Sequence, residues 1–142
     1  MESLVEKGLV RSIGVSNFSV EKLSHLVDWP EVKIKPAVNQ VECHPYLNQR
    51  RLLDYCSSRG VVMMAYSPVG AGERPDWTGI DAPSVINESV VKEVANRREL
   101  LPADVLLGWH LKRHTNTAVV VKSARLDRIT RNYEGAVQAL EV

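Results

Sequence analysis

Four apolar segments that end in polar side chains constrain the fold of this 142-residue chain more than any other feature. The run at residues 61–65 is continuously apolar, which is typical of a strand that is covered on both faces. The segments cover residues 9–15, 37–41, 61–65 and 117–121. The polar pairs at or near their ends are Ser16-Asn17, Asn39-Gln40, Tyr66-Ser67 and Lys122-Ser123. Because α/β proteins place ligand sites at the carboxyl ends of parallel strands, we expect these ends to form one binding face.

Helices are expected between the strands. A first short helix ends at Gly8, and Ser19 and Asn48 are N-cap candidates for the next two, of which the second ends at Gly60. Pro102 begins a later helix.

The segment before the last strand is longer than the others. Residues 70–79 are rich in turn formers and are expected to be a loop, and apolar spacing predicts a helix near residues 90–95. The last helix is expected over residues 126–133.

The spacing of the polar ends indicates repeated βα units. Asn17 and Gln40 are 23 residues apart, and Gln40 and Tyr66 are 26 apart. Tyr66 and Lys122 are 56 apart, because a loop and two helical segments intervene. Four parallel strands with right-handed helical crossovers predict an open sheet or a section of a barrel.

The composition is ordinary for one soluble globular domain over residues 1–142, with 44% apolar and 25% charged residues. The net charge of +1 gives no reason to expect nucleic acid or a membrane surface as a partner. No apolar run approaches the roughly 20 residues that cross a bilayer. The only cysteines, Cys43 and Cys56, favour a reducing compartment, so we expect a cytoplasmic protein.

Amide recognition is the first chemistry that the strand ends offer. Ser16, Asn17 and Gln40 could pair with the donors and acceptor of a carboxamide such as that of a nicotinamide ring. Tyr66 offers an aromatic face on which the ring could stack. The alternative is that these residues only cap helices and satisfy strand ends.

Anion recognition is the second chemistry. Lys122, Ser123 and Arg128 stand near the start of the last helix, where a lysine, a hydroxyl and an arginine suit a phosphate. The alternative is a solvated basic face. No metal site is expected, because His110 and His114 have ligand spacing but no accompanying acid.

The segments that carry these residues resemble the aldo-keto reductases, which are NADP-dependent oxidoreductases built on a (β/α)8 barrel. The matching stretches are Gly-Leu-Val-Arg-Ser-Ile-Gly-Val-Ser-Asn-Phe at 8–18, Pro-Ala-Val-Asn-Gln-Val-Glu-Cys-His-Pro-Tyr at 36–46, Ala-Tyr-Ser-Pro-Val-Gly at 65–70 and Val-Val-Lys-Ser at 120–123. The resemblance implies an α/β fold of the TIM-barrel type, here a half-barrel that covers about strands five to eight.

The resemblance also implies roles for the residues. Ser16, Asn17 and Gln40 would hold the carboxamide of NADPH, and Tyr66 would stack on the nicotinamide. The remaining implied cofactor contacts are Ser67 and the loop from Val69 to Gly72 along the pyrophosphate, Lys122, Ser123 and Arg128 at the 2′-phosphate, and Asn132 near the adenine.

The chain departs from the family pattern at three positions. Val121 stands where proline is usual, and Ala71 stands where a serine would offer a phosphate contact. Arg131 replaces a usual glutamate near the adenine and reverses the charge there.

No catalytic residue is expected, because the family's catalytic Asp, Tyr, Lys and His lie on the first four strands. The match starts in the helix after strand four, so we expect a truncated product, a fragment of a longer protein, or a half-barrel with another use. By resemblance the activity is NADPH-dependent reduction of small aldehydes or ketones, which needs a completed barrel; the chain alone is expected to be inactive. The alternative is a non-catalytic half-barrel that binds nucleotide, or that associates with itself or a larger assembly through open sheet edges.

Overall fold

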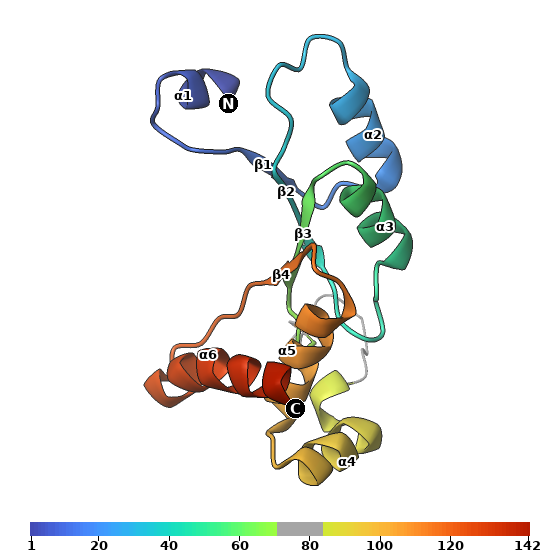
Figure 1. Cartoon of the computed structure of the whole chain (residues 1–142), viewed down its shortest axis with the longest axis vertical. Helices are drawn as coiled ribbons and strands as arrows, with labels where there is room; N and C mark the ends of the chain where they lie inside the picture. Colours follow the sequence, from blue (N-terminus) through green and yellow to red (C-terminus); the bar gives the residue numbers. More distant parts are fainter. Residues whose placement is uncertain (71–83) are drawn as a thin grey trace, which may run out of the picture.

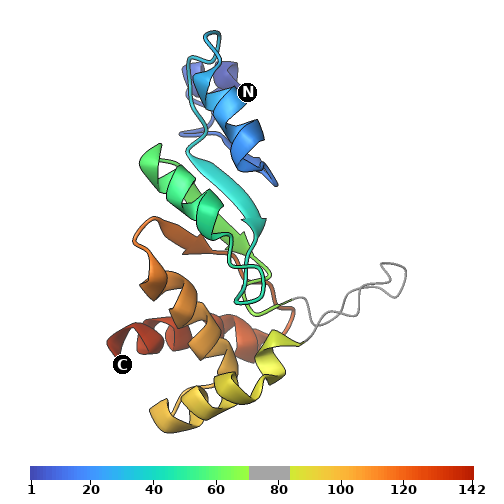
Figure 2. The same cartoon turned by 90° about the vertical axis from the view of Figure 1, so that its right-hand side faces the viewer.

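The computed structural model describes residues 1–70 and 84–142, which form four parallel strands with helices packed beside them. In chain order the elements are α1 (Glu2–Glu6), β1 (Gly14–Ser16), α2 (Val20–Asp28), β2 (Val38–Glu42), α3 (Arg50–Ser58), β3 (Val62–Tyr66), the 3-10 helix η2 (Val85–Asn87), α4 (Ser89–Arg98), α5 (Pro102–Arg113), β4 (Thr117–Val119) and α6 (Leu126–Glu141). Figures 1 and 2 show α4, α5 and α6 grouped at the β4 end of the sheet. The loop expected at residues 70–79 lies, after Gly70, outside the described residues.

The strands pair in chain order, β1-β2-β3-β4, and every pair is parallel. In register, Ser16 lies opposite Gln40, Gln40 opposite Met64, and Met64 opposite Ala118. This order confirms the predicted parallel βα arrangement and brings the carboxyl ends of all four strands to the same edge.

The two outer strands are shorter than the sequence predicts. The strand expected at residues 9–15 is formed only at Gly14–Ser16, and the one expected at 117–121 only at Thr117–Val119. β1 pairs only from the point where β2 begins, because Gly14 lies opposite Val38 and the preceding residues face no strand. An apolar run alone therefore overstated the length of both edge strands.

Helix ends follow the predicted caps with one shift. Ser19 caps α2, its side chain accepting a hydrogen bond from the Lys22 amide at 3.3 Å. The N-cap of α3 is Gln49 and not Asn48, but Asn48 Oδ1 still accepts from the Arg50 amide at 3.1 Å. α6 continues beyond Tyr133 to Glu141, because its second half also packs against α5.

The core lies between the strands and the helices. Met63 and Ala65 of β3 are fully buried together with Leu23 of α2 and Cys56 of α3. A second, smaller cluster joins η2, α4 and α5 through Val85, Val91 and Leu106. No helix of the described residues is long and apolar enough to cross a membrane.

Candidate functional site

Ser16, Asn17 and Gln40 come together at the ends of β1 and β2. The hydroxyl of Ser16 and the backbone amide of Asn17 both donate to the Gln40 carbonyl, each at 2.9 Å. Asn17 has a positive φ of 58°, which turns the chain directly after β1. The structure thus places these three predicted residues side by side, with Ser16 and Asn17 exposed.

Tyr66 joins this group from the end of β3. Its hydroxyl donates to Asn17 Oδ1 at 3.2 Å, so the strand ends of β1 and β3 are linked across β2. A hydroxyl, two side-chain amides and a half-buried aromatic ring therefore lie at adjoining strand ends. These groups offer the donors, acceptors and apolar face that an aromatic carboxamide needs.

Asn39 has a structural role instead. It is fully buried, its Nδ2 donates to the Phe18 carbonyl at 2.9 Å, and its Oδ1 accepts from the Phe18 amide at 3.4 Å. This side chain fixes the turn that carries Asn17, so for Asn39 the strand-end alternative is the correct one.

A cleft begins at Tyr66 and runs across the β4 end of the sheet. Its volume is about 830 Å³, which lies within the range of about 300–1,000 Å³ of small-molecule sites. Its lining comes from the segment after β3, η2, α4, the start of α5, the segment after β4, and α6. The residues are Tyr66, Ser67, Pro68, Val69, Gly70, Ile86, Asn87, Lys92, Leu101, Pro102, Ala103, Val120, Val121, Lys122, Ser123, Arg128, Arg131 and Asn132.

The charged residues in the described lining of the cleft are all positive. Four cations, Lys92, Lys122, Arg128 and Arg131, line it, and no described aspartate or glutamate does. In the described part of the chain only Arg131 among them forms an ion pair, with Asp104 of α5. A cleft with this charge attracts anions and can hold phosphate groups.

The cleft gathers seven of the ten predicted site residues: Tyr66, Ser67, Val69, Lys122, Ser123, Arg128 and Asn132. The other three, Ser16, Asn17 and Gln40, do not line it but adjoin it through the hydrogen bond between Tyr66 and Asn17. Ala71 and Gly72, which were expected along a pyrophosphate, lie outside the described residues.

Sequence reasoning missed the contributions of α4 and α5. Lys92 and the residues from Leu101 to Ala103 line the cleft, although no motif marks them. Only the fold, which brings both helices to the β4 end, identifies them. Arg131, expected as a reversed charge near an adenine, lines the cleft beside Asn132 and forms an ion pair with Asp104.

His110 of α5 lies in the core behind the cleft and contacts Pro68 in the cleft wall. Its side chain is fully buried, and its Nε2 lies 3.2 Å from the carbonyl oxygen of Pro68 in the cleft wall. Burial lowers the pKa of His110 to about 4, so the ring is neutral at pH 7. Since a carbonyl only accepts, the ring proton is on Nε2 and donates to Pro68.

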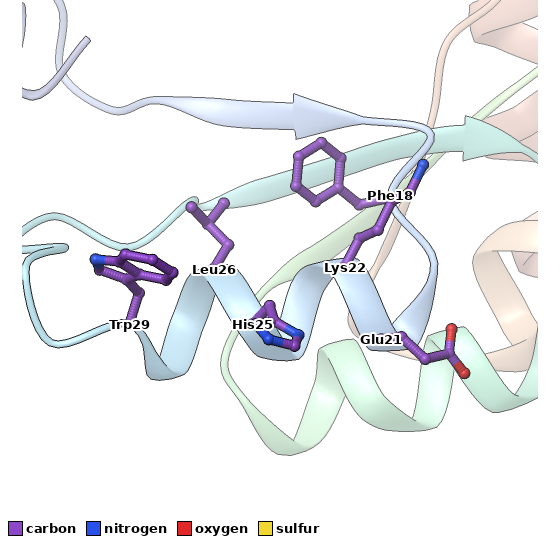
Figure 3. A pocket seen from close by; sticks show the side chains of 6 residues that line it. All are labelled: Phe18, Glu21, Lys22, His25, Leu26 and Trp29. Atoms are coloured by element: carbon purple, nitrogen blue, oxygen red, sulfur yellow. The ribbon is translucent and has the colours of Figure 1, made fainter.

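Two further hollows lie near β1, and none of the predicted site residues lines them. Figure 3 shows the first, of about 420 Å³, lined by Phe18, Glu21, Lys22, His25, Leu26 and Trp29. The second, of about 550 Å³, shares Phe18 and Leu26 and includes Ile13, Gly14 and Val15. Both are mainly apolar.

Among residues 1–70 and 84–142 no group of three or more His, Cys, Asp or Glu could hold a metal ion.

Comparison with known proteins identifies related chains. A model of the Aldo/keto reductase family matches residues 1–140. The chain is 40% identical over 134 residues to prostaglandin-E(2) 9-reductase of Oryctolagus cuniculus, covering 94% of this chain and 41% of the relative. It is 38% identical over 134 residues to aldo-keto reductase family 1 member C15 of Rattus norvegicus, with the same coverage.

A solved structure agrees with the fold. Aldose reductase from Giardia lamblia superposes with a TM-score of 0.83 at 35% identity, over 96% of this chain and 43% of that chain. The fold is therefore an α/β partial barrel, as predicted. The chain spans about two fifths of the length of the curated relatives that it matches.

The buried histidine gives a pH-dependent prediction. The unfolded chain takes up a proton near pH 6.5 whereas folded His110 does so at about pH 4, so its contribution to stability is complete above pH 6.5 and is lost as the pH falls to 4. In denaturant titrations, wild type should lose up to about 3 kcal/mol over this interval relative to His110→Gln, which keeps an amide donor but does not titrate. His25→Gln, at an exposed position, should follow wild type. Parallel pH curves for wild type and His110→Gln would contradict the assignment.

Proposed function

The chain belongs to the aldo/keto reductase family, and on this premise we propose that it binds NADPH as the cofactor half of a carbonyl-reducing barrel. The observation that carries the proposal is the cationic cleft of about 830 Å³ that continues from the Tyr66 strand end. The relatives' names, a prostaglandin reductase and an aldose reductase, agree with carbonyl reduction as the reaction class.

The nicotinamide end of the cofactor is assigned to the polar strand ends. Ser16, Asn17 and Gln40 would hold the carboxamide, and the ring of Tyr66 would stack on the nicotinamide. Two hydrogen bonds support this assignment, because they hold Ser16, Asn17 and Tyr66 at adjoining strand ends before a ligand binds. The Ser16 hydroxyl donates to the Gln40 backbone carbonyl, and the Tyr66 hydroxyl donates to Asn17 Oδ1.

The phosphate end is assigned to the far part of the cleft. Ser67 and Val69 would lie along the pyrophosphate, and Lys122, Ser123 and Arg128 would meet the 2′-phosphate, with Asn132 beside the adenine. Lys122 and Arg128 form no ion pair in the described part of the chain, so both charges are available to a phosphate. NADH lacks the 2′-phosphate, and the proposal therefore favours NADPH.

The chemistry follows from what this half of a barrel provides. Bound NADPH supplies a hydride for an aldehyde or ketone. This chain's residues would orient the nicotinamide and anchor the phosphates. The proton donor would come from a complementary half-barrel, so we propose that the chain alone binds the cofactor without turning over a carbonyl substrate.

The two buried, unpaired cysteines, Cys43 and Cys56, support a reducing compartment such as the cytoplasm.

Charge reversal tests the cofactor assignment. Lys122→Glu and Arg128→Glu should each weaken NADPH binding by about tenfold or more, because a hydrogen bond to a charged group is worth about 1.5–3 kcal/mol. The effect on NADH should be clearly smaller. Binding is measured by calorimetry, with Lys112→Glu on the exposed part of α5 as the control. Equal affinity of wild type for NADPH and NADH, or variants that bind as wild type does, would refute the 2′-phosphate assignment.

A second candidate function is association, and it is favoured by apolar surface near β1 and on α6. β1 and β4 each have one unpaired edge. The two mainly apolar hollows adjoin β1 and α2, and α6 exposes apolar side chains at helical spacing. These are Leu126, Ile129, Tyr133, Val137 and Leu140. Since four strands are half of an eight-stranded barrel, a second copy would offer the missing edges, and we propose self-association through them.

Sedimentation tests this association. The wild-type chain should sediment as a dimer or larger species at micromolar concentration, because an uncovered apolar stripe favours burial against another molecule. Ile129→Lys combined with Tyr133→Lys should shift the chain toward monomer, whereas Glu134→Lys on the same helix should not. A stable, well-folded monomeric wild type would disprove self-association.

A further inference from the structure

Asp104 and Arg131 form an ion pair between α5 and α6, next to the cleft. The Asp104 side chain is 1% exposed, and its Oδ2 accepts both from the Leu101 amide at 2.8 Å and from the Arg131 guanidinium. Arg131 also donates to Gln138 Oε1 at 3.3 Å. A carboxylate buried this deeply is tolerated only when it is paired and hydrogen-bonded, so α5 depends on the arginine of α6.

The two helices cross at glycines. A Cβ on Gly135 would collide with Asp104 Oδ1, and a Cβ on Gly108 would lie 2.7 Å from the Cβ of Ala139. Neither position has room for a side chain, so the backbone of each helix lies directly against the other helix at these two glycines. The ion pair adds a polar constraint near the first of these contacts, and together they define how α6 is rotated about its axis.

That rotation matters because α6 carries the far end of the cleft. Arg128 lies one turn before Arg131, Asn132 follows it directly, and both line the cleft. Since one helix holds all three residues, the contact that fixes Arg131 also fixes where Arg128 and Asn132 face. Arg128 itself has no ion pair in the described part of the chain that could place it.

Arg131 could alternatively act as a fourth cation that touches the ligand, because it also lines the cleft. Its surroundings favour the indirect role. One guanidinium nitrogen serves Asp104 and Gln138, and Nε is buried with no acceptor among the described residues. The guanidinium is thus turned toward α5, and the side chain as a whole is only 35% exposed.

We infer that the Asp104–Arg131 ion pair is a positioning device that orients α6 so that Arg128 and Asn132 face the nucleotide. The inference rests on the proposed NADPH binding for its ligand. The pair itself makes no contact with the phosphate in this arrangement. Asp104 and Arg131 are positioning residues, and Arg128 is the residue that binds.

A double-mutant cycle separates the indirect role from direct contact. Asp104→Asn and Arg131→Gln should each weaken NADPH binding about tenfold and reduce the preference over NADH, because either change frees α6. The double variant should be no weaker than the worse single variant, since both act through the same contact. Effects that instead multiply to about a hundredfold, or no effect of Asp104→Asn, would overturn the inference. Glu93→Gln, which breaks an exposed ion pair with Arg97 on α4, is the control.

Hydrogen exchange of the cofactor-free chain gives an independent readout. Asp104→Asn should speed amide exchange in the first half of α6, residues 126–133, while α3 stays protected; unchanged exchange in α6 would also overturn the inference.

If wild type fails to bind NADPH, the proposed function fails, and this measurement still decides the positioning claim. If Arg131→Gln does not fold because Asp104 is left unpaired, Arg131→Lys takes its place, and it should keep binding closer to wild type than Asp104→Asn does.

Discussion

Parallel pairing in chain order is the constraint on which the rest of this structure depends. Each helix returns the chain to the same end of the sheet, so every strand delivers its last residues to one edge. Ser16, Gln40 and Tyr66 meet there for this reason, although up to 50 positions separate them in the sequence. The site is thus a consequence of topology, and the polar side chains only give it a chemistry.

The long segment between β3 and β4 converts that edge into a cleft. α4 and α5 bring Lys92 and the start of α5 to its wall, and His110 holds the Pro68 carbonyl from within the core. α6 closes the far side against α5, where glycines allow the close approach and Asp104 binds Arg131. In the proposed function, recognition of a phosphate at Lys122 and Arg128 would therefore depend on how α5 and α6 pack against each other.

The sequence was sufficient for the parts that local chemistry determines. Apolar runs located β2 and β3 and overlapped β1 and β4, Ser19 located the start of α2, and the predicted residues include seven of the eighteen that line the cleft. It was insufficient where a residue's structure depends on a segment elsewhere in the chain. β1 is short because residues 9–12 have no partner strand, and Asn39 is buried because Phe18 folds onto it. The sequence gives no sign that Lys92 lines the cleft or that Asp104 pairs with Arg131, because both contacts depend on how the helices pack.

The central claim is that the cleft holds a 2′-phosphorylated dinucleotide with its nicotinamide at the β1–β3 strand ends. A crystal structure of the chain with NADP⁺ tests it most directly. The account predicts the carboxamide within hydrogen-bond distance of Asn17 and Gln40, the nicotinamide against Tyr66, and the 2′-phosphate at Lys122 and Arg128. NADP⁺ bound with its 2′-phosphate away from both cations, or bound outside the cleft, would contradict it.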